Sequence, residues 1–250
     1  MTIAIDTFIK FNHTEEMTKL KRLFNAEKLN NLDFAMFFAD QFAGKVQYGA
    51  RSEMCNALKN ATYANVWYMF NVTRQYFGPA DVNSYSIESL KNTTIDWSKN
   101  MRQWTYQTCA EVGYYQTPHG NVRMRSHLVN LDYYKNICTQ AFGEGIWPNV
   151  NHTNALLGET HLARTNIFFS NGVEDPWKWA GAMAVPEHSG MEAQIIDCPN
   201  CAHCVELYTP KDSDSHELKK ARWRIERWLD NILRERRDSV IESEFLKLTE

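Results

Sequence analysis

The sequence predicts an α/β protein in which helices occupy the first part of the chain and strands follow later. Up to about residue 142, apolar residues recur at intervals of three and four, which is the spacing of one helical face. After about residue 160, short apolar runs lie between turn residues, which is typical of buried strands. The intervening residues 143–159 are rich in Gly, Pro and Asn and predict a linker. We therefore expect two domains, residues 1–160 and residues 161–250.

Helices are predicted at several places in the first domain. Thr14 is a candidate N-cap for a helix whose apolar face carries Met17, Leu20 and Phe24. A second helix is predicted from Asp33 to Gly49, with apolar positions at Phe34, Phe37, Phe38, Phe42 and Val46. Further helical patterns lie at residues 54–59 and 130–142.

The second domain is predicted to hold two short strands and a long helix. The strands lie at residues 165–170 and 193–197. The helix covers residues 215–236, and Asp214 stands three residues before Glu217, as in a capping box. Its apolar stripe consists of Leu218, Ala221, Ile225, Trp228, Leu229 and Ile232. Because a parallel sheet buries both faces, we expect further strands to precede these two in a complete protein.

Each predicted strand is followed by a loop that carries a side chain able to act in proton transfer. Asp175 follows the first strand in N-G-V-E-D-P-W, and His203 follows the second in A-H-C. An acid followed by a histidine is the order in which α/β-hydrolases place the last two members of a Ser-Asp-His triad. We therefore expect adjacent parallel strands and a distance of about 2.6–3.2 Å between an Asp175 oxygen and the His203 ring.

These residues also admit simpler interpretations. An Asp before Pro in a Gly-containing turn is ordinary turn chemistry, and Trp177 could fill a core. The residues Cys198, Cys201, His203 and Cys204 are potential ligands of zinc or parts of a thiol pair. All four lie within seven residues without a second ligand pair, which does not favour zinc, and the following residues do not favour the helix that an activated thiol pair requires. We expect no metal site.

Composition excludes some classes of function. The chain has 250 residues, of which 44% are hydrophobic and 13% aromatic, as in globular proteins. Lys and Arg number 27 against 30 Asp and Glu, and the formal charge of -3 argues against binding to nucleic acid. No apolar run approaches the ~20 residues of a membrane span. We therefore expect no nucleic acid and no membrane as partners.

Six cysteines and five Asn-x-Ser/Thr sequons point weakly to the secretory route. The sequons are at Asn12, Asn60, Asn71, Asn92 and Asn151. The first residues, M-T-I-A-I-D, have neither the basic nor the apolar region of a signal peptide. Secretory features without a signal peptide lead us to expect a truncated amino terminus.

Four segments together resemble one family. Residues 34–51 resemble the D-F-x-x-F-A-D-x-x-A-x-x-V-Q-Y-G-x-R segment, and residues 104–117 the W-x-Y-Q-x-C-x-E motif. Residues 166–177 resemble N-I-x-F-S-N-G-x-x-D-P-W, and residues 202–207 resemble A-H-C-x-D-L with Glu206 in place of its acid. The family is that of serine carboxypeptidases which includes lysosomal Pro-Xaa carboxypeptidase, dipeptidyl peptidase II and thymus-specific serine protease.

The resemblance implies the carboxy-terminal part of an α/β-hydrolase fold, preceded by most of an inserted helical cap domain. The cap would be residues 1–160, and residues 161–250 would supply the acid strand, the histidine strand and the final helix. Asp175 matches the triad acid and His203 the triad base. Glu111 and Trp177 fall where the family builds its substrate pocket, and Cys109 and Cys138 are an implied disulfide. Peptides would be the substrates and no cofactor is implied.

One part of the family pattern is missing from the chain. The nucleophile motif Gly-x-Ser-x-Gly is absent, because none of the 12 serines has Gly at both second-neighbour positions. We therefore expect a carboxy-terminal fragment of a secreted or lysosomal serine-type exopeptidase that is inactive alone. The alternatives are a non-catalytic relative that keeps the cap as a binding surface and a thiol or zinc protein built on residues 198–204.

Overall fold

The structure is a computed structural model that describes residues 1–59, 61, 65–120, 124–159, 162, 165–187 and 189–248. The chain forms two compact units. Unit 1 consists of Met1–Gly44 and Glu53–Leu157, and unit 2 of Lys45–Ser52 and Gly158–Glu250. A short segment from the first part of the chain thus belongs to the second unit. None of the helices in the described ranges combines the length and apolar character that a membrane span requires.

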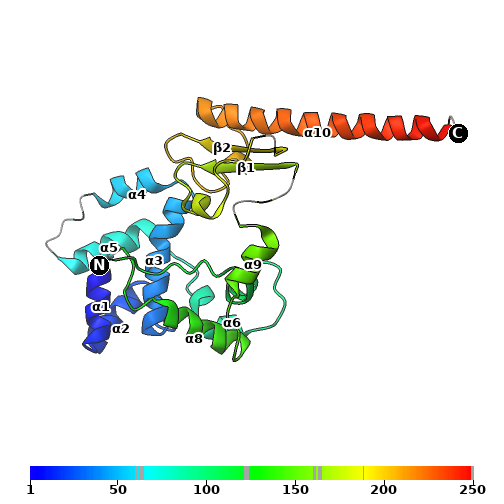
Figure 1. The fold of residues 1–250 in the computed structure, drawn as a ribbon. Coiled ribbons are helices and arrows are strands. Elements are labelled where there is room, and N and C mark those ends of the chain that lie inside the picture. The colour runs from blue at the N-terminus through cyan, green and yellow to red at the C-terminus, as the bar shows by residue number, and fades with distance from the viewer. Residues whose placement is uncertain are drawn as a thin grey trace. The chain divides into compact units, whose positions relative to one another are not determined.

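Unit 1 is helical (Figure 1). Its helices are α1 (Thr2–Lys10), α2 (Thr14–Leu23), α3 (Asn31–Gln47), α4 (Arg51–Leu58), α5 (Val66–Phe77), α6 (Ile87–Lys91), α7 (Met101–Gln107), α8 (Leu131–Phe142) and α9 (Val150–Leu157). Single turns of 3-10 helix at η1 (Asn83–Tyr85) and of π-helix at η2 (Thr108–Val112) complete it. The last residues of α3 and the first of α4 lie in unit 2.

The core of unit 1 is aromatic. Phe34, Phe37 and Phe38 of α3 are at most 1% exposed, because their spacing places them on one side of the helix. The Phe38 ring meets Phe24 at 5.5 Å and Phe70 at 5.6 Å between centroids, both edge to face. This geometry is favourable for aromatic rings beyond the area that they bury.

Several predicted helix limits in unit 1 are wrong. Thr14 is the first residue of α2 and not its cap, which is His13. The helix predicted from Asp33 begins at Asn31, because the Asn30 side chain accepts hydrogen bonds from the backbone N–H groups of residues 32 and 33. The predicted linker at residues 143–159 contains α9. Gly49 follows α3 in the left-handed region, at φ +77°, as a residue that ends a helix does.

Unit 2 contains a two-stranded parallel sheet in its described part, formed by β1 (Ile167–Gly172) and β2 (Met191–Ile196). The register pairs Ile167 with Met191 and Gly172 with Ile196, so the two strands end side by side. The predicted parallel pairing is therefore confirmed, although β1 lies two residues later than the predicted strand 165–170 and β2 begins two residues before the predicted strand 193–197. The fold is mixed helical with a small parallel sheet, which is compatible with the predicted α/β class.

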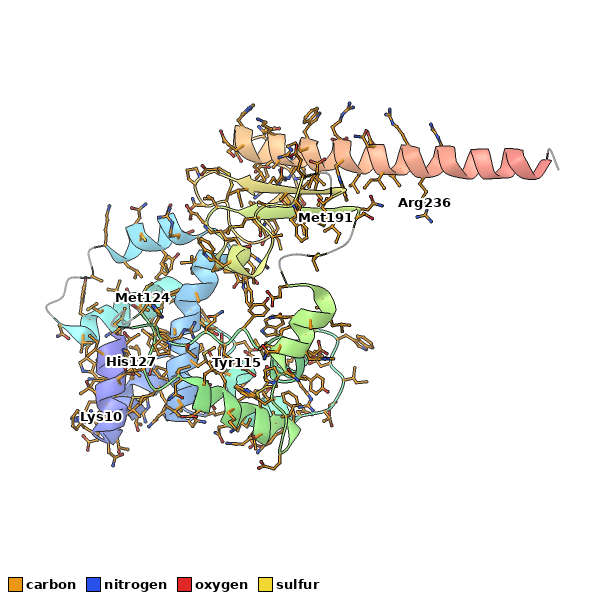
Figure 2. All side chains as sticks on the ribbon, in the orientation of Figure 1. Lys10, Tyr115, Met124, His127, Met191 and Arg236 are labelled. Atoms are coloured by element: carbon orange, nitrogen blue, oxygen red, sulfur yellow. A yellow bond between two sulfur atoms is a disulfide. The ribbon has the colours of Figure 1, made fainter. Side chains whose placement is uncertain are left out.

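The final helix of unit 2, α10 (His216–Leu248), differs from its prediction in start and length. Ser215 is the cap, since its hydroxyl accepts the backbone N–H of Leu218, whereas Asp214 forms an ion pair with Arg222 at 2.5 Å. Leu218 and Ala221 are buried, but Leu229 is 46% exposed, so the predicted stripe is buried only near the start of the helix. Met191 of β2 and Arg236 of α10 are labelled in Figure 2.

Candidate active site

Asp175 lies in the turn that follows β1. Its backbone N–H donates to the carbonyl of Gly172 at 3.0 Å, and a short 3-10 helix, η3 (Pro176–Ala180), begins directly after it. Asp175 caps this helix, because its Oδ1 accepts the backbone N–H of Trp177 at 2.8 Å. The residue is 6% exposed. Turn chemistry therefore uses one oxygen of the carboxylate and leaves the other for a further partner.

That partner is the ring of His203. The Nδ1 atom of His203 lies 2.8 Å from Oδ2 of Asp175, within the distance that the sequence predicts. The His203 side chain is 32% exposed, whereas that of Asp175 is only 7% exposed. An acid buried behind a partly accessible imidazole is the relation that a triad acid has to its base.

The loop that carries His203 packs tightly against the end of β1. A Cβ atom added at Gly172 would lie 2.4 Å from the carbonyl oxygen of Ala202 and 2.5 Å from that of Cys201. Only glycine permits this approach, since real Cβ atoms do not come within 3.0 Å of such atoms. The Gly in N-G-V-E-D-P-W therefore brings the histidine loop close to the acid turn.

Residues 45–52 also contact the site. The backbone N–H of His203 donates to the carbonyl oxygen of Gln47 at 2.9 Å, and Nε1 of Trp177 donates to Oε1 of Gln47 at 3.0 Å. The ring of Tyr48 stands edge to face with that of His203, at 6.2 Å between centroids. Gln47 and Tyr48 lie outside the predicted site, although Q-Y-G-x-R belongs to one of the segments that carry the family resemblance.

The predicted substrate-binding residues lie in different units. Trp177 is half-buried in unit 2, next to Asp175. Glu111 is an exposed residue of η2 in unit 1, and its backbone carbonyl accepts the hydroxyl of Thr153 at 2.8 Å. Their roles stay predictions.

The cysteines form two disulfides. One joins Cys109 to Cys138, the pair that the resemblance implies, and the other joins Cys198 to Cys201. Cys198 and Cys201, which form the C-x-x-C pair and are two of the four candidate zinc ligands, are thus bonded to each other. Within the described ranges, no group of three His, Cys, Asp or Glu side chains is placed to hold a metal.

Cys204 is a free thiol directly after His203. Burial, together with the nearby carboxylates of Glu206 and Asp175, raises the pKa of this thiol. A raised pKa disfavours the thiolate, which is the reactive form of cysteine. Cys204 therefore lacks the lowered pKa that activates a cysteine nucleophile.

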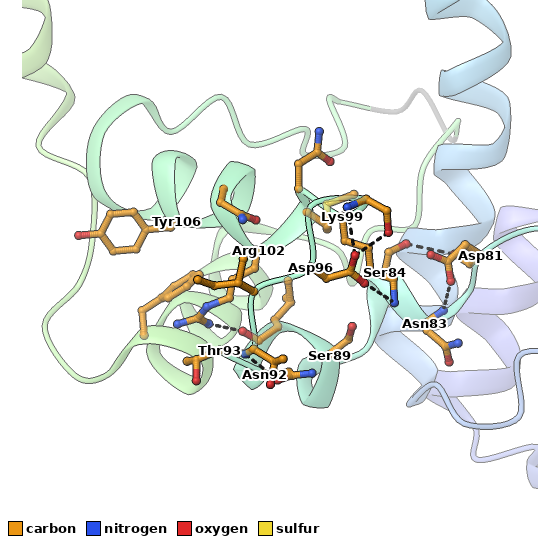
Figure 3. Close-up of a pocket in the computed structure, with 18 residues that line it drawn as sticks. Asp81, Asn83, Ser84, Ser89, Asn92, Thr93, Asp96, Lys99, Arg102 and Tyr106 are labelled. Carbon is orange, nitrogen blue, oxygen red and sulfur yellow. Dashed lines mark hydrogen bonds and ion pairs between the residues drawn. The ribbon is translucent and has the colours of Figure 1, made fainter.

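Unit 1 contains a pocket of about 640 Å³, whose lining residues are drawn in Figure 3. Its lining includes Asn92, Asp96, Lys99, Arg102 and Tyr106. Asp96 accepts hydrogen bonds from Ser98 and forms an ion pair with Lys99 at 3.5 Å. Neighbouring residues therefore balance the charge of its carboxylate. Asn92, the first residue of one sequon, is among the residues that line this pocket.

Comparisons with known proteins identify the family. A buried acid bonded to a histidine, at the ends of two parallel strands, is the kind of arrangement that hydrolytic triads use. The family model described as serine carboxypeptidase S28 matches residues 3–225, and the chain belongs to this family. The family resemblance seen in the sequence is thereby confirmed.

Individual relatives agree with this family. The chain is 34% identical to "Probable serine protease EDA2" of Arabidopsis thaliana, over 74% of this chain and 39% of that protein. It is 31% identical to thymus-specific serine protease of Mus musculus, over 60% of this chain and 30% of that protein. Identity to lysosomal Pro-X carboxypeptidase of Homo sapiens is 27%, over 75% of this chain and 37% of that protein. The chain thus spans 30–39% of the length of these relatives.

Proposed function

We propose that this chain supplies the acid and the base of a serine-type exopeptidase that cleaves peptides. Family membership supports the class of enzyme. The observation that carries the assignment of residues is the 2.8 Å contact between Asp175 Oδ2 and His203 Nδ1. The acid is buried and the ring is partly accessible, as proton transfer to a substrate-bound group requires.

Unit 1 is proposed to be most of a helical cap domain, and unit 2 the carboxy-terminal part of an α/β-hydrolase domain. The all-helical elements of unit 1 support the first assignment. Parallel β1 and β2, followed by the long helix α10, support the second. Cap and hydrolase would then correspond approximately to residues 1–160 and 161–250, with residues 45–52 contributing to the hydrolase part.

The proposed mechanism assigns one task to each residue. His203 takes the proton of a serine hydroxyl through Nε2 and later donates it to the leaving amine of the peptide. Asp175 accepts a hydrogen bond from the Nδ1–H group of His203, which fixes the tautomer of the ring and stabilises the imidazolium. Trp177 and Glu111 are proposed to line the substrate pocket.

The proposed site of action is an extracellular or lysosomal compartment. Two relatives are named for such places, a "Probable extracellular serine carboxypeptidase" of Arthroderma benhamiae and the lysosomal Pro-X carboxypeptidase. The sequons at Asn12, Asn71, Asn92 and Asn151 are exposed, and we propose glycans there. Asn60 lies outside the described residues.

The 250-residue chain alone is proposed to be inactive, because no Gly-x-Ser-x-Gly motif occurs in it. A triad enzyme without its nucleophile loses most of its rate enhancement. The test is labelling with a fluorophosphonate probe, together with hydrolysis of prolyl peptides. We expect neither from the chain alone, and both after fusion to the amino-terminal part of a longer relative that contains the motif.

Two variants of the fused protein control the test. His203→Ala should abolish hydrolysis, whereas His216→Ala, a histidine in the first turn of α10, should leave it unchanged. Labelling of any serine in the chain alone would contradict the proposed inactivity. A fused protein that folds but neither reacts nor hydrolyses would favour the non-catalytic binding relative.

A further inference from the structure

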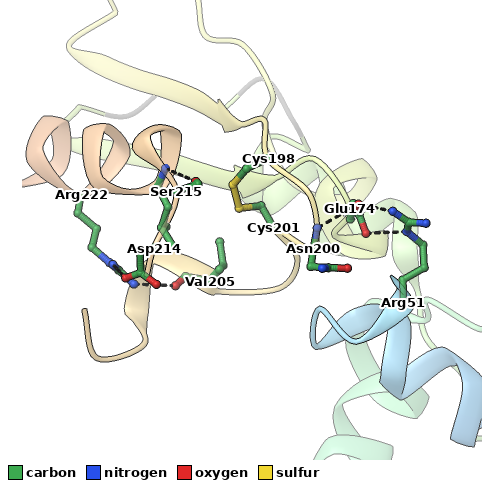
Figure 4. Close-up of a disulfide and its surroundings, with 10 residues drawn as sticks. Arg51, Glu174, Cys198, Asn200, Cys201, Val205, Asp214, Ser215 and Arg222 are labelled. Carbon is green, nitrogen blue, oxygen red and sulfur yellow. Dashed lines mark hydrogen bonds and ion pairs between the residues drawn. A yellow bond between two sulfur atoms is a disulfide. The ribbon is translucent and has the colours of Figure 1, made fainter. Parts of the chain in front are cut away.

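The acid turn and the histidine loop are connected by contacts that do not involve Asp175 or His203 themselves. We call residues 172–175 the acid turn, residues 197–204 the histidine loop and residues 45–52 the bridging segment. All three belong to unit 2. Figure 4 shows where they meet, around Glu174, Arg51 and Asn200.

Glu174 is the residue at which the three segments join. Arg51 donates to both of its carboxylate oxygens, from Nε to Oε2 and from Nη2 to Oε1, each at 2.8 Å. The backbone N–H of Asn200 donates to Oε1 at 3.1 Å, and the backbone N–H of Glu174 donates to the carbonyl of Cys201 at 2.9 Å. Hydrogen bonds from Arg51 lower the pKa of Glu174, so the carboxylate is charged at neutral pH.

The bridging segment fits the histidine loop closely at its backbone. A Cβ atom added at Gly49 would lie 2.7 Å from the carbonyl oxygen of Asn200, and the φ of +77° also favours glycine there. The backbone N–H of Ser52 donates to Oδ1 of Asn200 at 3.3 Å. Two residues earlier than Gly49, the carbonyl of Gln47 accepts the N–H of His203. The segment therefore contacts the loop on both sides of Ala202.

We propose that Arg51 and Glu174 are positioning residues that fix Asp175 relative to His203. This inference rests on the proposed function, because the pair has to be positioned only if it acts together. Glu174 is the chain neighbour of Asp175, and Asn200 lies three residues before His203, so a fixed Glu174–Asn200 contact holds both loops. A bidentate Arg–carboxylate pair defines direction as well as distance.

The pair acts on geometry more than on overall stability. The Arg51 side chain is 45% exposed and that of Glu174 is 16% exposed, so solvent reaches the arginine side of the pair and screens its charge. In contrast, a shift of about 1 Å in a reacting group costs on the order of 100-fold in rate. Variants of Arg51 and Glu174 should therefore remain folded while the relation between the acid and the base changes.

The test uses the 250-residue chain itself. Nitrogen-15 NMR of the His203 ring reports the fraction of the imidazole in the Nδ1–H tautomer, which the bond to Asp175 selects. We expect this tautomer to dominate in the wild type and to be lost in Asp175→Asn. Glu174→Gln and Arg51→Met should shift at least half of the ring population to the Nε2–H tautomer, and Arg51→Lys should retain more of the wild-type signal.

The matched control is another ion pair of unit 2. Arg224 and Glu192 are 3.0 Å apart, with exposures of 39% and 46%, and lie away from both loops on α10 and β2. Arg224→Met and Glu192→Gln should leave the His203 tautomer unchanged. Thermal unfolding of all variants verifies that they are folded.

The possible results separate the two ideas. If the tautomer depends on Asp175 but is unchanged in Glu174→Gln and Arg51→Met, the positioning inference is wrong and the Asp175–His203 pair stands. If the wild type shows no tautomer preference that depends on Asp175, the pair is not formed and the proposed function fails with the inference. An equal loss in the Arg224 and Glu192 variants would also overturn the inference, because the effect would not be specific to the bridging segment.

Discussion

The two carboxylate oxygens of Asp175 have different partners and therefore different roles. Oδ1 caps η3 by accepting the N–H of Trp177, and Oδ2 holds the ring of His203. The turn interpretation and the triad interpretation of this residue are therefore compatible. The substitution of an acid by its amide affects only the second role, since an amide oxygen can still accept the capping hydrogen bond.

Stability measurements on two variants of Asp175 should separate these roles. Asp175→Ala removes the cap and is expected to be less stable than Asp175→Asn by about 1 kcal/mol, the usual contribution of an N-cap side chain. Urea denaturation of the two variants gives the difference. Equal stabilities would mean that the cap contributes nothing to unit 2.

A second acid of interest, Asp33, lies in the core of unit 1. It accepts the hydroxyl of Tyr133 at 3.1 Å and the side-chain amide of Asn30 at 2.6 Å. Burial raises its pKa from 3.8 to about 6, although the Tyr133 hydrogen bond opposes this shift. Between about pH 4 and pH 6 the native state therefore binds more protons at this site than the unfolded state.

We expect Asp33 to make the protein less stable as the pH rises through this interval. Its contribution is most favourable below pH 3.8 and is lost as the pH passes about 6. The size of the effect is on the order of 2 kcal/mol. Asp33→Asn should remove it, so the difference in unfolding free energy between variant and wild type should change by this amount between pH 4 and pH 7. A difference independent of pH would contradict the assignment.

At the scale of elements, α3 organises unit 1 through its phenylalanines. Phe38 is 1% exposed and contacts the rings of Phe24, Phe34, Phe42 and Phe70. Phe38→Ala should lower the unfolding free energy by about 3–5 kcal/mol, because it removes buried surface and leaves a cavity. Phe11, which is 64% exposed, provides the control, and Phe11→Ala should cost less than about 0.5 kcal/mol. Similar effects in the two variants would disprove the assignment of Phe38 to the core.

The sequence was sufficient to predict those elements whose pattern is local. The period of Phe34, Phe37 and Phe38 predicts α3, and the apolar runs before Asp175 and His203 predict β1 and β2. Helix starts were less accurate, because several side chains near a start can cap it and only packing selects one. At α10 the capping side chain is that of Ser215, because the carboxylate of Asp214 forms an ion pair with Arg222.

The contacts that support the site could not be predicted from local sequence patterns. Arg51 and Glu174 are 123 positions apart in the chain, and Gln47 and Trp177 are 130 apart. No periodicity relates such residues. In contrast, the strand-then-acid and strand-then-histidine order is local, and parallel pairing with matching ends then brings Asp175 and His203 together.

At the scale of the whole molecule, unit 2 is discontinuous in sequence. Residues 45–52 belong to it although 105 residues of unit 1, Glu53–Leu157, separate them from its remainder. The histidine loop and the acid turn each bond to this segment, through Gln47 and Arg51. A continuous fragment that begins after unit 1 therefore lacks part of the structure around the proposed active site.

We expect residues 158–250 expressed alone to be less ordered around the site than the same residues in the full chain. The amide of His203 loses its acceptor, the carbonyl of Gln47, and Glu174 loses Arg51. Hydrogen exchange at residues 198–204 should therefore be faster in the fragment by at least tenfold, which corresponds to about 1.4 kcal/mol of local stability. A fragment in which a short linker joins residues 45–52 to residue 158 is the matched control and should recover most of the protection. If the fragment without residues 45–52 is protected as well as the full chain, the segment is not needed to hold the histidine loop, and unit 2 is a continuous domain in energetic terms.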